Sequence, residues 1–239
     1  MTTTEKRATI ILVHGAWADG SSWANVIPPL RDLGFEVLAA PIPMTSLGDD
    51  VAALTRYLDR ASAPVVLVGH AYAGAVVSSI DDNRVRSVVL VAALAPAKGE
   101  TVADVFYREE PHPQAPQLAP DTHGFIWMPE EGFQNAFAQN AKAETKKILS
   151  AIQRPIAVAC IQEAVTHTNW SDKPSWYLLA EEDRMIKPTI QRFMAERMGA
   201  RIRSVAADHT PSITEPRAVV EIIAEAVTHH EIPKHGSLA

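Results

Sequence analysis

An alanine occupies the position at which this sequence pattern places a nucleophile. The segment Gly69–Gly74 (GHAYAG) directly follows the apolar run Pro64–Val68, and a tight turn after a buried strand is typical of the nucleophile elbow G-x-S-x-G. Ala71 stands at the middle position, whose side chain projects over the end of a sheet. A methyl group neither attacks a carbonyl nor passes a proton to a base, so acyl-enzyme chemistry has no starting point there. The pattern is altered a second time at Ala73, where glycine is preferred.

Two residues with acid–base chemistry follow later strand-like runs. Asp183 lies in the loop after Ser175–Leu179, and His209 follows Ile202–Val205. The chain order of elbow, acid and histidine is the order used by enzymes whose nucleophile sits on such an elbow. We therefore expect a dyad in which Asp183 fixes the tautomer of His209. Two neighbouring carboxylates compete for the acid role: Glu182 and Asp208.

Backbone amides near the elbow could stabilise a developing oxyanion. The first strand-like run, Ala8–Val13, ends in the turn His14–Trp17. The N–H groups of this turn, together with the N–H of Tyr72 after the elbow position, are expected to face the same point.

Other side chains are weaker substitutes for the missing hydroxyl. The Tyr72 phenol is a poor nucleophile near neutral pH, and its side chain should point away from residue 71. Ser22 is placed to cap the first helix, and Ser21 stands next to it. The apolar neighbours of Cys160 indicate a buried, unreactive thiol. Three histidines are expected to line a pocket or only its walls: His70, His123 and His167.

Large apolar side chains outside the elbow suggest a binding pocket. An apolar pocket for a small ring or acyl group would be formed by Trp17, Trp127, Met128 and Trp170. The same side chains are equally well explained as ordinary core residues.

The order of elements predicts an α/β fold with a mostly parallel sheet and helices on both faces. Strands are predicted at Ala8–Val13, Glu36–Ala40, Pro64–Val68, Ser87–Ala92, Ser175–Leu179 and Ile202–Val205. Helical spacing of apolar residues predicts crossover helices at Ser22–Leu33, Asp49–Arg60, Ala73–Asp81, Lys187–Met198 and Glu215–Thr228.

The alternation of strand and helix breaks in one long segment. Residues 95–172 contain a proline-rich stretch and two helical patterns, Glu131–Asn140 and Lys142–Ile152. We interpret this segment as a cap inserted after the fourth strand, over the carboxyl ends of the strands, where open α/β sheets bind ligands. The predicted division is therefore a core of residues 1–94 and 173–230, a cap of residues 95–172 and a tail of residues 231–239.

Composition limits the partners of the chain. A length of 239 residues with 47% hydrophobic residues suits one domain. A formal net charge of −6, without a basic block, argues against nucleic acid. No secretory signal or membrane span is recognised, and the single cysteine suits a cytoplasmic location. The sequence does not indicate an oligomeric state.

No cofactor or metal ion is expected from the motifs. Gly69 and Gly74 have P-loop spacing, but Ala75-Val76 replaces the Lys-Ser/Thr pair that holds phosphate and magnesium. A G-x-G-x-x-G dinucleotide motif is missing because residue 71 is not glycine. No HExxH or paired CxxC spacing indicates a metal site.

These motifs together resemble the small α/β-hydrolases that include plant salicylate methylesterases, hydroxynitrile lyases and bacterial esterase-like proteins. The resemblance rests on segments 14–23, 68–74, 174–177 and 182–186 and on Asp208-His209. It implies a nucleophile position at Ala71, an acid at Asp183, a base at His209 and oxyanion donors at the amides of Ala16 and Tyr72. The chain departs from the family pattern at Ala71 and Ala73.

Three functions remain compatible with the sequence, and each uses a small-molecule substrate or ligand, an apolar ester or carbonyl compound. The first is an enzyme of esterase ancestry that lacks the serine. The second is a cofactor-free lyase, decarboxylase or cyclase in which His209 acts as general base. The third is a binding protein without turnover. The intact pairing of Asp183 with His209 favours an enzyme.

Overall fold

The centre of the molecule is a six-stranded parallel sheet with the strand order β2-β1-β3-β4-β7-β8. The structure is a computed structural model, and it describes residues 8–61 and 64–231. The strands of this sheet are β1 (Thr9–Val13), β2 (Glu36–Ala40), β3 (Val65–His70), β4 (Val85–Val91), β7 (Ser175–Ala180) and β8 (Arg201–Val205). The predicted parallel α/β sheet is therefore confirmed, with all six strands at the expected places.

The central strands are apolar on both faces, as strands covered by helices on both sides must be. Every residue of β1 and β3 is buried. Strand β3 extends beyond its predicted end, because its parallel pairing with β4 continues as far as His70 opposite Val91. This extension brings the residue before Ala71 into the sheet.

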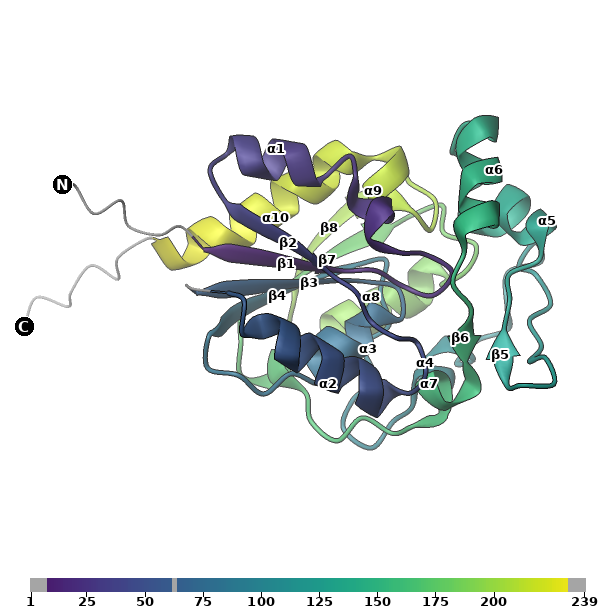
Figure 1. Cartoon of the computed structure of the whole chain (residues 1–239), viewed down its shortest axis with the longest axis horizontal. Coiled ribbons are helices and arrows are strands. Elements are labelled where there is room, and N and C mark those ends of the chain that lie inside the picture. Colours follow the sequence, from purple (N-terminus) through teal and green to yellow (C-terminus); the bar gives the residue numbers. More distant parts are fainter. Residues whose placement is uncertain (1–7, 62–63, 232–239) are drawn as a thin grey trace, which may run out of the picture.

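Helices cover both faces of the sheet, as predicted (Figure 1). On one face, α1 (Ile27–Asp32) and α10 (Pro216–Glu231) pack with Leu30, Val219 and Ile223 against Ile10 and Leu12. The other face is covered by α2 (Leu47–Leu58), α3 (Ala73–Ser78) and α8 (Pro188–Arg197). The short helix α9 (Pro211–Thr214) precedes α10. No helix among the described residues has the length and apolar character needed to cross a membrane.

The first predicted helix, Ser22–Leu33, is divided in two. A 3-10 turn, η1, spans Gly20–Trp23, and α1 begins only at Ile27. The two prolines at positions 28 and 29 fit the first turn of a helix but not its interior, so α1 starts immediately before them. The expected cap at Ser22 is also wrong, because the Asp19 side chain caps η1 by accepting from the Ser21 amide.

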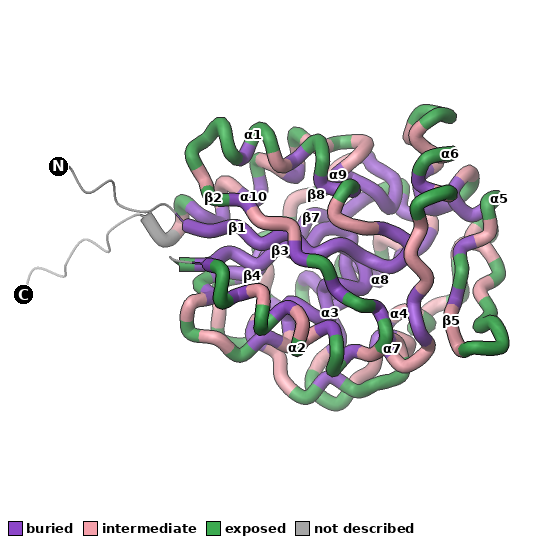
Figure 2. Tube along the Cα trace, viewed as in Figure 1, coloured by how far each residue is buried: buried purple, intermediate pink, exposed green. Residues whose placement is uncertain are grey.

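Most of the segment between β4 and β7 forms short elements at one end of the sheet (Figure 1), whereas its last residues return to α3, where the Asn169 side chain binds the Val77 carbonyl oxygen. These elements are α4 (Val102–Phe106), β5 (Phe125–Ile126), α5 (Glu130–Gly132), the π-helical turn η2 (Phe133–Phe137), α6 (Ala143–Ile152), β6 (Ile156–Ala157), α7 (Val158–Gln162) and η3 (Asn169–Ser171). The outer surface of α5 and α6 is largely exposed, whereas the central strands of the six-stranded sheet are buried (Figure 2).

Hydrogen bonds attach this segment to loops at the carboxyl ends of the strands. The Trp17 amide donates to the Arg154 carbonyl oxygen, and the Ala157 amide donates to the Met44 carbonyl oxygen, each at 3.0 Å. The Gln139 side-chain amide donates to the Glu182 carbonyl oxygen at 2.7 Å. These contacts agree with a cap formed by residues 95–172, and we propose the division into core, cap and tail that the sequence suggested. Residues 232–239 of the expected tail lie outside the described residues, and residue 231 ends α10.

The helix predicted at Glu131–Asn140 is replaced by α5 and the π-helical turn η2. The Ala138 amide donates to the carbonyl oxygen of Phe133, five residues earlier, at 3.2 Å. This wider turn ends the helix early and sets the ring of Phe137 5.2 Å from the ring of His209, centroid to centroid. π-Helical turns of this kind are frequent at functional sites.

Candidate active site

Ala71 occupies a strained turn between β3 and α3. Its backbone has a φ of 50°, in the left-handed region that residues with a Cβ rarely adopt. The carbonyl oxygen of Ala71 accepts hydrogen bonds from the amides of Gly74 at 3.0 Å and Leu94 at 2.9 Å. These contacts hold the strained geometry. A tight strained turn therefore follows β3 as expected from the sequence, with the methyl group of Ala71 at its middle position.

Glycines allow the chain to approach this turn closely. A Cβ at Gly15 would lie 2.8 Å from the Cβ of Ala71 and 2.9 Å from the carbonyl oxygen of His70. A Cβ at Gly69 would lie 2.7 Å from the carbonyl oxygen of Ala73. Because position 69 has no side chain, α3 packs tightly on the end of β3 even though Ala73 replaces the second glycine of the pattern.

Asp183 and His209 form a buried pair. The Oδ2 atom of Asp183 lies 2.8 Å from the Nδ1 atom of His209, and the two side chains are 0% and 3% exposed. The second oxygen of Asp183 accepts from the amides of Met185 and Ile186, and the Gln191 side chain donates to Oδ2 at 2.8 Å. The carboxylate is therefore fixed by three donors besides the histidine. Nε2 of His209 has no hydrogen-bond partner in residues 8–61 and 64–231.

The two competing carboxylates make no hydrogen bond to the His209 ring among the described residues. Asp208 accepts from the amide and hydroxyl of Thr210 and from the amide of Asn140. Glu182 is exposed and accepts from the Asn140 side chain. Both residues join the loops of His209 and Asp183 to Asn140 in the inserted segment. Asp183 is thus the acid that the geometry favours.

The amides expected to stabilise an oxyanion lie beside Ala71. Ala16 and Tyr72 are buried and border the same cavity as Ala71. Neither amide donates to an acceptor in the part of the chain that the structure describes. Trp17, the next residue in the first turn, has a φ of 58° and directs its own amide to Arg154. The two remaining amides are available to a bound oxygen atom.

The Tyr72 side chain points away from the elbow into a buried polar cluster, as expected. Its hydroxyl donates to Oδ2 of Asp50 at 2.7 Å, and the Cys160 thiol lies 3.7 Å from the same oxygen. Burial raises the pKa of Asp50, the pKa of Tyr72 and, to about 12, the pKa of Cys160. Neither Tyr72 nor Cys160 is therefore an activated nucleophile, in agreement with the sequence argument.

His209 opens onto a cavity lined almost entirely by apolar side chains, with a volume of about 60 Å³. Its walls come from both the core and the inserted segment, and they comprise Ala16, Trp17, Ala71, Tyr72, Leu94, Val102, Ala103, Phe106, Tyr107, Leu118, Ile126, Ile156, Ile161, Met185, Ile186 and His209. A small apolar group fits such a site better than a charged one.

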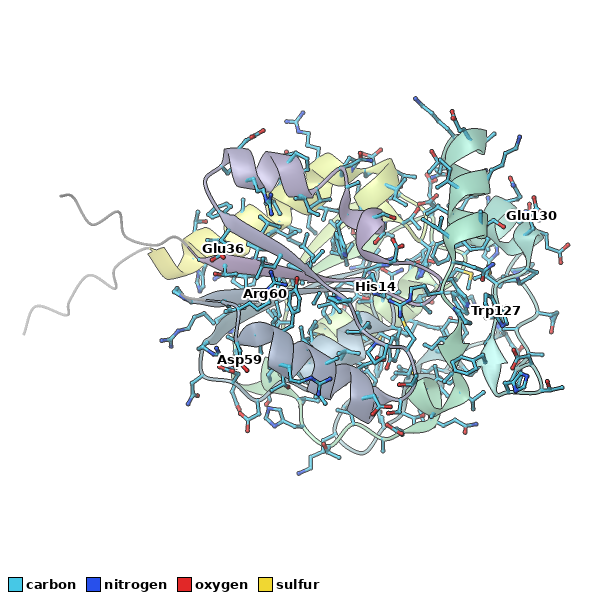
Figure 3. All side chains as sticks on the ribbon, in the orientation of Figure 1. His14, Glu36, Asp59, Arg60, Trp127 and Glu130 are labelled. Carbon is cyan, nitrogen blue, oxygen red and sulfur yellow. The ribbon has the colours of Figure 1, made fainter. Side chains whose placement is uncertain are left out.

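Only Trp17 of the four expected pocket residues lines this cavity. Ile126 faces the cavity from β5, so the next residue, Trp127, points outward; it is 49% exposed (Figure 3). Met128 is buried but packs against Gly132. Trp170 follows Asn169, whose side chain binds the carbonyl oxygens of Val77 and Ile80 near the far end of α3. For Trp127, Met128 and Trp170 the pocket prediction is corrected.

Two more histidines are buried around the dyad. The Nε2 atom of His70 donates to the carbonyl oxygen of His209 at 2.6 Å, and burial lowers the pKa of His70 to about 3. His14 donates from Nδ1 to the carbonyl oxygen of Gly15, and burial lowers the pKa of His14 to about 4. Both rings are neutral near pH 7. Their hydrogen bonds to backbone carbonyl oxygens stabilise the turns, and the rings bring no positive charge to the site.

The remaining candidates lie away from the cavity lining. Ser21 and Ser22 are engaged with Asp19 in η1. His123 is exposed and His167 is half-buried. Among the described residues, no three His, Cys, Asp or Glu side chains are arranged to hold a metal ion.

A family model identifies the protein family of this chain. A family model described as "Alpha/beta hydrolase family" matches residues 10–222. The chain belongs to the alpha/beta hydrolase family. "Probable hydrolase R7" of Phoma sp. is 25% identical over 240 residues, which cover 90% of this chain and 96% of that protein.

Solved structures share this alpha/beta hydrolase fold. Polyneuridine aldehyde esterase superposes with a TM-score of 0.81 and 16% identity, covering 92% of this chain and 98% of that one. A pyrethroid hydrolase from Sphingobium faniae superposes with a TM-score of 0.80 and 20% identity, covering 92% and 97%. The resemblance predicted from the motifs is thereby confirmed at the level of family and fold.

Proposed function

We propose that this alpha/beta hydrolase is an enzyme that acts on a small apolar carbonyl compound or ester, with His209 as general base and without a covalent intermediate. The observation that carries the proposal is the pairing of Asp183 with His209 at 2.8 Å, at an apolar cavity beside Ala71. A binding protein without turnover has no use for a buried, oriented base. The apolar lining selects the substrate class.

Asp183 prepares His209 for proton transfer. With Nδ1–H donated to the carboxylate, the lone pair of the neutral ring is on Nε2, which has no hydrogen-bond partner among the described residues. When Nε2 takes a proton, the adjacent carboxylate stabilises the imidazolium that forms. A base held in this way contributes about 10²–10⁴-fold to the rate of proton transfer.

The apolar cavity favours proton removal from the substrate itself. A held water molecule needs about two to four polar partners. Few side chains that line the cavity offer a polar group to a water molecule. Those of Trp17 and Tyr72 are bound to the Ile126 carbonyl oxygen and to Asp50, which leaves the Tyr107 hydroxyl and His209. For a carbonyl compound, the C–H bond next to the carbonyl breaks, the proton moves to Nε2, and the electron pair moves to the carbonyl oxygen. The amides of Ala16 and Tyr72 would stabilise the resulting enolate.

Direct ester hydrolysis is a second candidate, favoured by the names of related proteins, which include hydrolases and esterases. Here His209 would take a proton from a water molecule as its oxygen attacks the ester carbonyl, and the same amides would stabilise the tetrahedral adduct. Both candidates use the same base and the same oxyanion site. They differ because the first removes a proton from a C–H bond of the substrate, whereas hydrolysis forms a bond between a water oxygen and the ester carbonyl carbon.

The test is turnover with product identification on short aryl esters and enolisable ketones. It compares the wild type, His209→Ala, Ala71→Ser and the double variant Ala71→Ser/His209→Ala, each shown to be folded by circular dichroism. We expect the wild type to convert at least one substrate and His209→Ala to lose that activity by about 10²-fold or more. Conversion of a ketone supports removal of a proton from the substrate by His209. Conversion of esters alone supports attack of a water molecule on the ester carbonyl.

The serine variants separate a different mechanism from this one. If Ala71→Ser gains ester hydrolysis by orders of magnitude, loses it in the double variant, and the wild type is inert on every substrate, the chain is a silenced esterase. Tight binding without turnover in all variants identifies a binding protein. Either result overturns the proposal.

A further inference from the structure

A second pocket adjoins the cavity at His209. It lies under the proline-rich stretch between α4 and β5, and its volume is about 390 Å³, against about 60 Å³ for the inner cavity. Its walls are Phe106, Tyr107, Glu110, Pro111, His112, Pro113, Ala115, Pro116, Gln117, Leu118 and Met185. We call it the outer pocket.

The two spaces share walls. Phe106, Tyr107, Leu118 and Met185 border both the outer pocket and the inner cavity. A ligand whose carbonyl end lies beside His209 therefore meets these side chains on its way into the outer pocket. The inner cavity is too small for more than a compact group, so the larger part of a ligand would occupy the outer pocket.

The chemistry of the outer pocket differs from that of the inner cavity. His112 accepts from the Gln114 amide through Nδ1 at 3.1 Å, so its hydrogen is on Nε2, where it can be donated. Burial and the charges of Arg184 and Lys187 lower the pKa of His112, which keeps the ring neutral near pH 7. Gln117 offers both a donor and an acceptor, and Glu110 offers acceptors.

The proline-rich wall is preformed. Proline fixes φ, so the three prolines at positions 111, 113 and 116 stiffen the backbone of this wall. The Ala115 amide donates to the His112 carbonyl oxygen at 2.8 Å and closes a turn. A pocket built on stiff backbone loses little conformational entropy when a ligand binds.

We propose that the outer pocket binds an uncharged, hydroxyl-bearing part of the substrate, while the carbonyl end enters the cavity at His209. The mixed donors and acceptors match hydroxyl groups, which both donate and accept. This inference deepens the proposed function and rests on it for the position of the carbonyl end. The substrate class is then a compact apolar carbonyl compound or ester with a polyhydroxylated extension.

Equilibrium binding tests the outer pocket without requiring turnover. Isothermal titration calorimetry on the full chain compares acetophenone, 4′-phenylacetophenone and 4′-(β-glucosyloxy)acetophenone. We expect the glucosyl ketone to bind at least about tenfold more tightly than acetophenone, and the phenyl ketone to gain less. Equal affinities for the glucosyl ketone and acetophenone, or tighter binding of the phenyl ketone, would overturn the proposal.

Two tryptophan variants localise the effect. Ala115→Trp fills the outer pocket without changing the inner lining, and Ala52→Trp places the same side chain on the exposed face of α2 as a matched control. The increase in affinity that the glucosyl group gives should vanish in Ala115→Trp and persist in Ala52→Trp. The affinity for acetophenone should be unchanged in both variants. Persistence of the gain in Ala115→Trp contradicts the assignment.

Phenyl β-glucoside separates this inference from the proposed function because it has no carbonyl group. Binding of this glucoside that is lost in Ala115→Trp supports the outer pocket even if no ketone is converted. Failure of both glucosides to bind overturns the outer pocket and leaves the role of His209 to the turnover measurements.

Discussion

The hydroxyl of Tyr72 donates a hydrogen bond of 2.7 Å to the buried carboxyl group of Asp50. Tyr72 directly follows Ala71, and its amide is one of the two proposed oxyanion donors. Asp50 also accepts from the amide of Met44 at 2.7 Å, a residue with a φ of 64°. The carboxyl group thus connects the turn at Ala71 to the loop after β2, and the bond from the Ala157 amide to the Met44 carbonyl oxygen extends this connection to β6.

Removal of the Tyr72 hydroxyl should destabilise the fold and lower turnover. Tyr72→Phe leaves a buried carboxyl oxygen with one donor fewer, which costs about 2 kcal/mol in the free energy of unfolding. If the bond also fixes the Tyr72 amide, kcat falls while KM changes little. Urea denaturation and steady-state kinetics measure the two effects. Tyr57→Phe, which removes a bond to the Ala39 carbonyl oxygen away from the site, is the matched control for kcat.

Asp183→Asn should impair catalysis far more than it alters the fold. An amide in place of the carboxylate presents the wrong hydrogen-bonding partner to Nδ1 of His209 and no longer stabilises an imidazolium. A comparable change in a studied serine protease costs about 10⁴-fold in kcat. We expect a loss of at least about 10²-fold in the activity found for the wild type. Glu182→Gln, which changes an exposed neighbour, should retain that activity; equal losses in the two variants would refute the assignment of the acid.

The stability of the protein should fall in mildly acidic solution because of His70. The pKa of this ring is lowered from 6.5 to about 3, so between these values the unfolded chain binds a proton that the folded chain does not. Stability is therefore complete above pH 6.5 and decreases as the pH falls. From pH 7.5 to pH 5, His70 accounts for a loss of about 2 kcal/mol.

Urea denaturation at both pH values measures this loss. His70→Gln keeps a donor for the His209 carbonyl oxygen but does not titrate, so its stability should depend less on pH by about the same amount. His123→Gln, an exposed control, should behave as the wild type does. An unchanged pH dependence in His70→Gln would show that the buried ring does not account for the loss.

Gly74 should not tolerate a side chain. A Cβ at this position would collide with the carbonyl oxygen of Leu94, which belongs to the backbone and cannot turn aside. We expect Gly74→Ala to lower the free energy of unfolding by about 1–3 kcal/mol. A Cβ at Gly48 in α2 would approach no atom closer than 3.8 Å, so Gly48→Ala should be neutral or stabilise the helix by up to about 1 kcal/mol. Thermal denaturation ranks the two variants, and equal stability would contradict the close packing of α3.

The architecture could be predicted because its signals are local. Runs such as Ile10–Val13 are long enough to be strands and too apolar to have a solvated face, and the helical patterns between them require parallel crossovers. The pairing of Asp183 with His209 could be predicted because the loops after parallel strands meet at one edge of the sheet. Within the inserted segment the helix predicted at Lys142–Ile152 is observed as α6. The π-helical turn at Phe133–Phe137 was not predicted; it places Phe137 beside His209, a residue distant in the sequence, and no local pattern shows such a contact.

The pocket residues likewise depend on structure that no local sequence pattern shows. Trp127 and Ile126 are adjacent, and only the register of the two-residue strand β5 determines which of them faces the cavity. Asp50, by contrast, had a signal that could have been used. It shares the spacing of Leu47, Leu54 and Leu58 on α2, so an acidic residue on the buried stripe of the helix indicated a buried polar partner.

The central claim is that His209 removes a proton from a carbonyl compound bound beside Ala71, and solvent isotope exchange tests it most directly. Acetophenone is incubated with the protein in D₂O, and deuterium in its methyl group is measured by proton NMR, with His209→Ala as comparison. The account predicts exchange above the buffer rate with the wild type and a return to the buffer rate in His209→Ala. Equal exchange rates for the two proteins would contradict it.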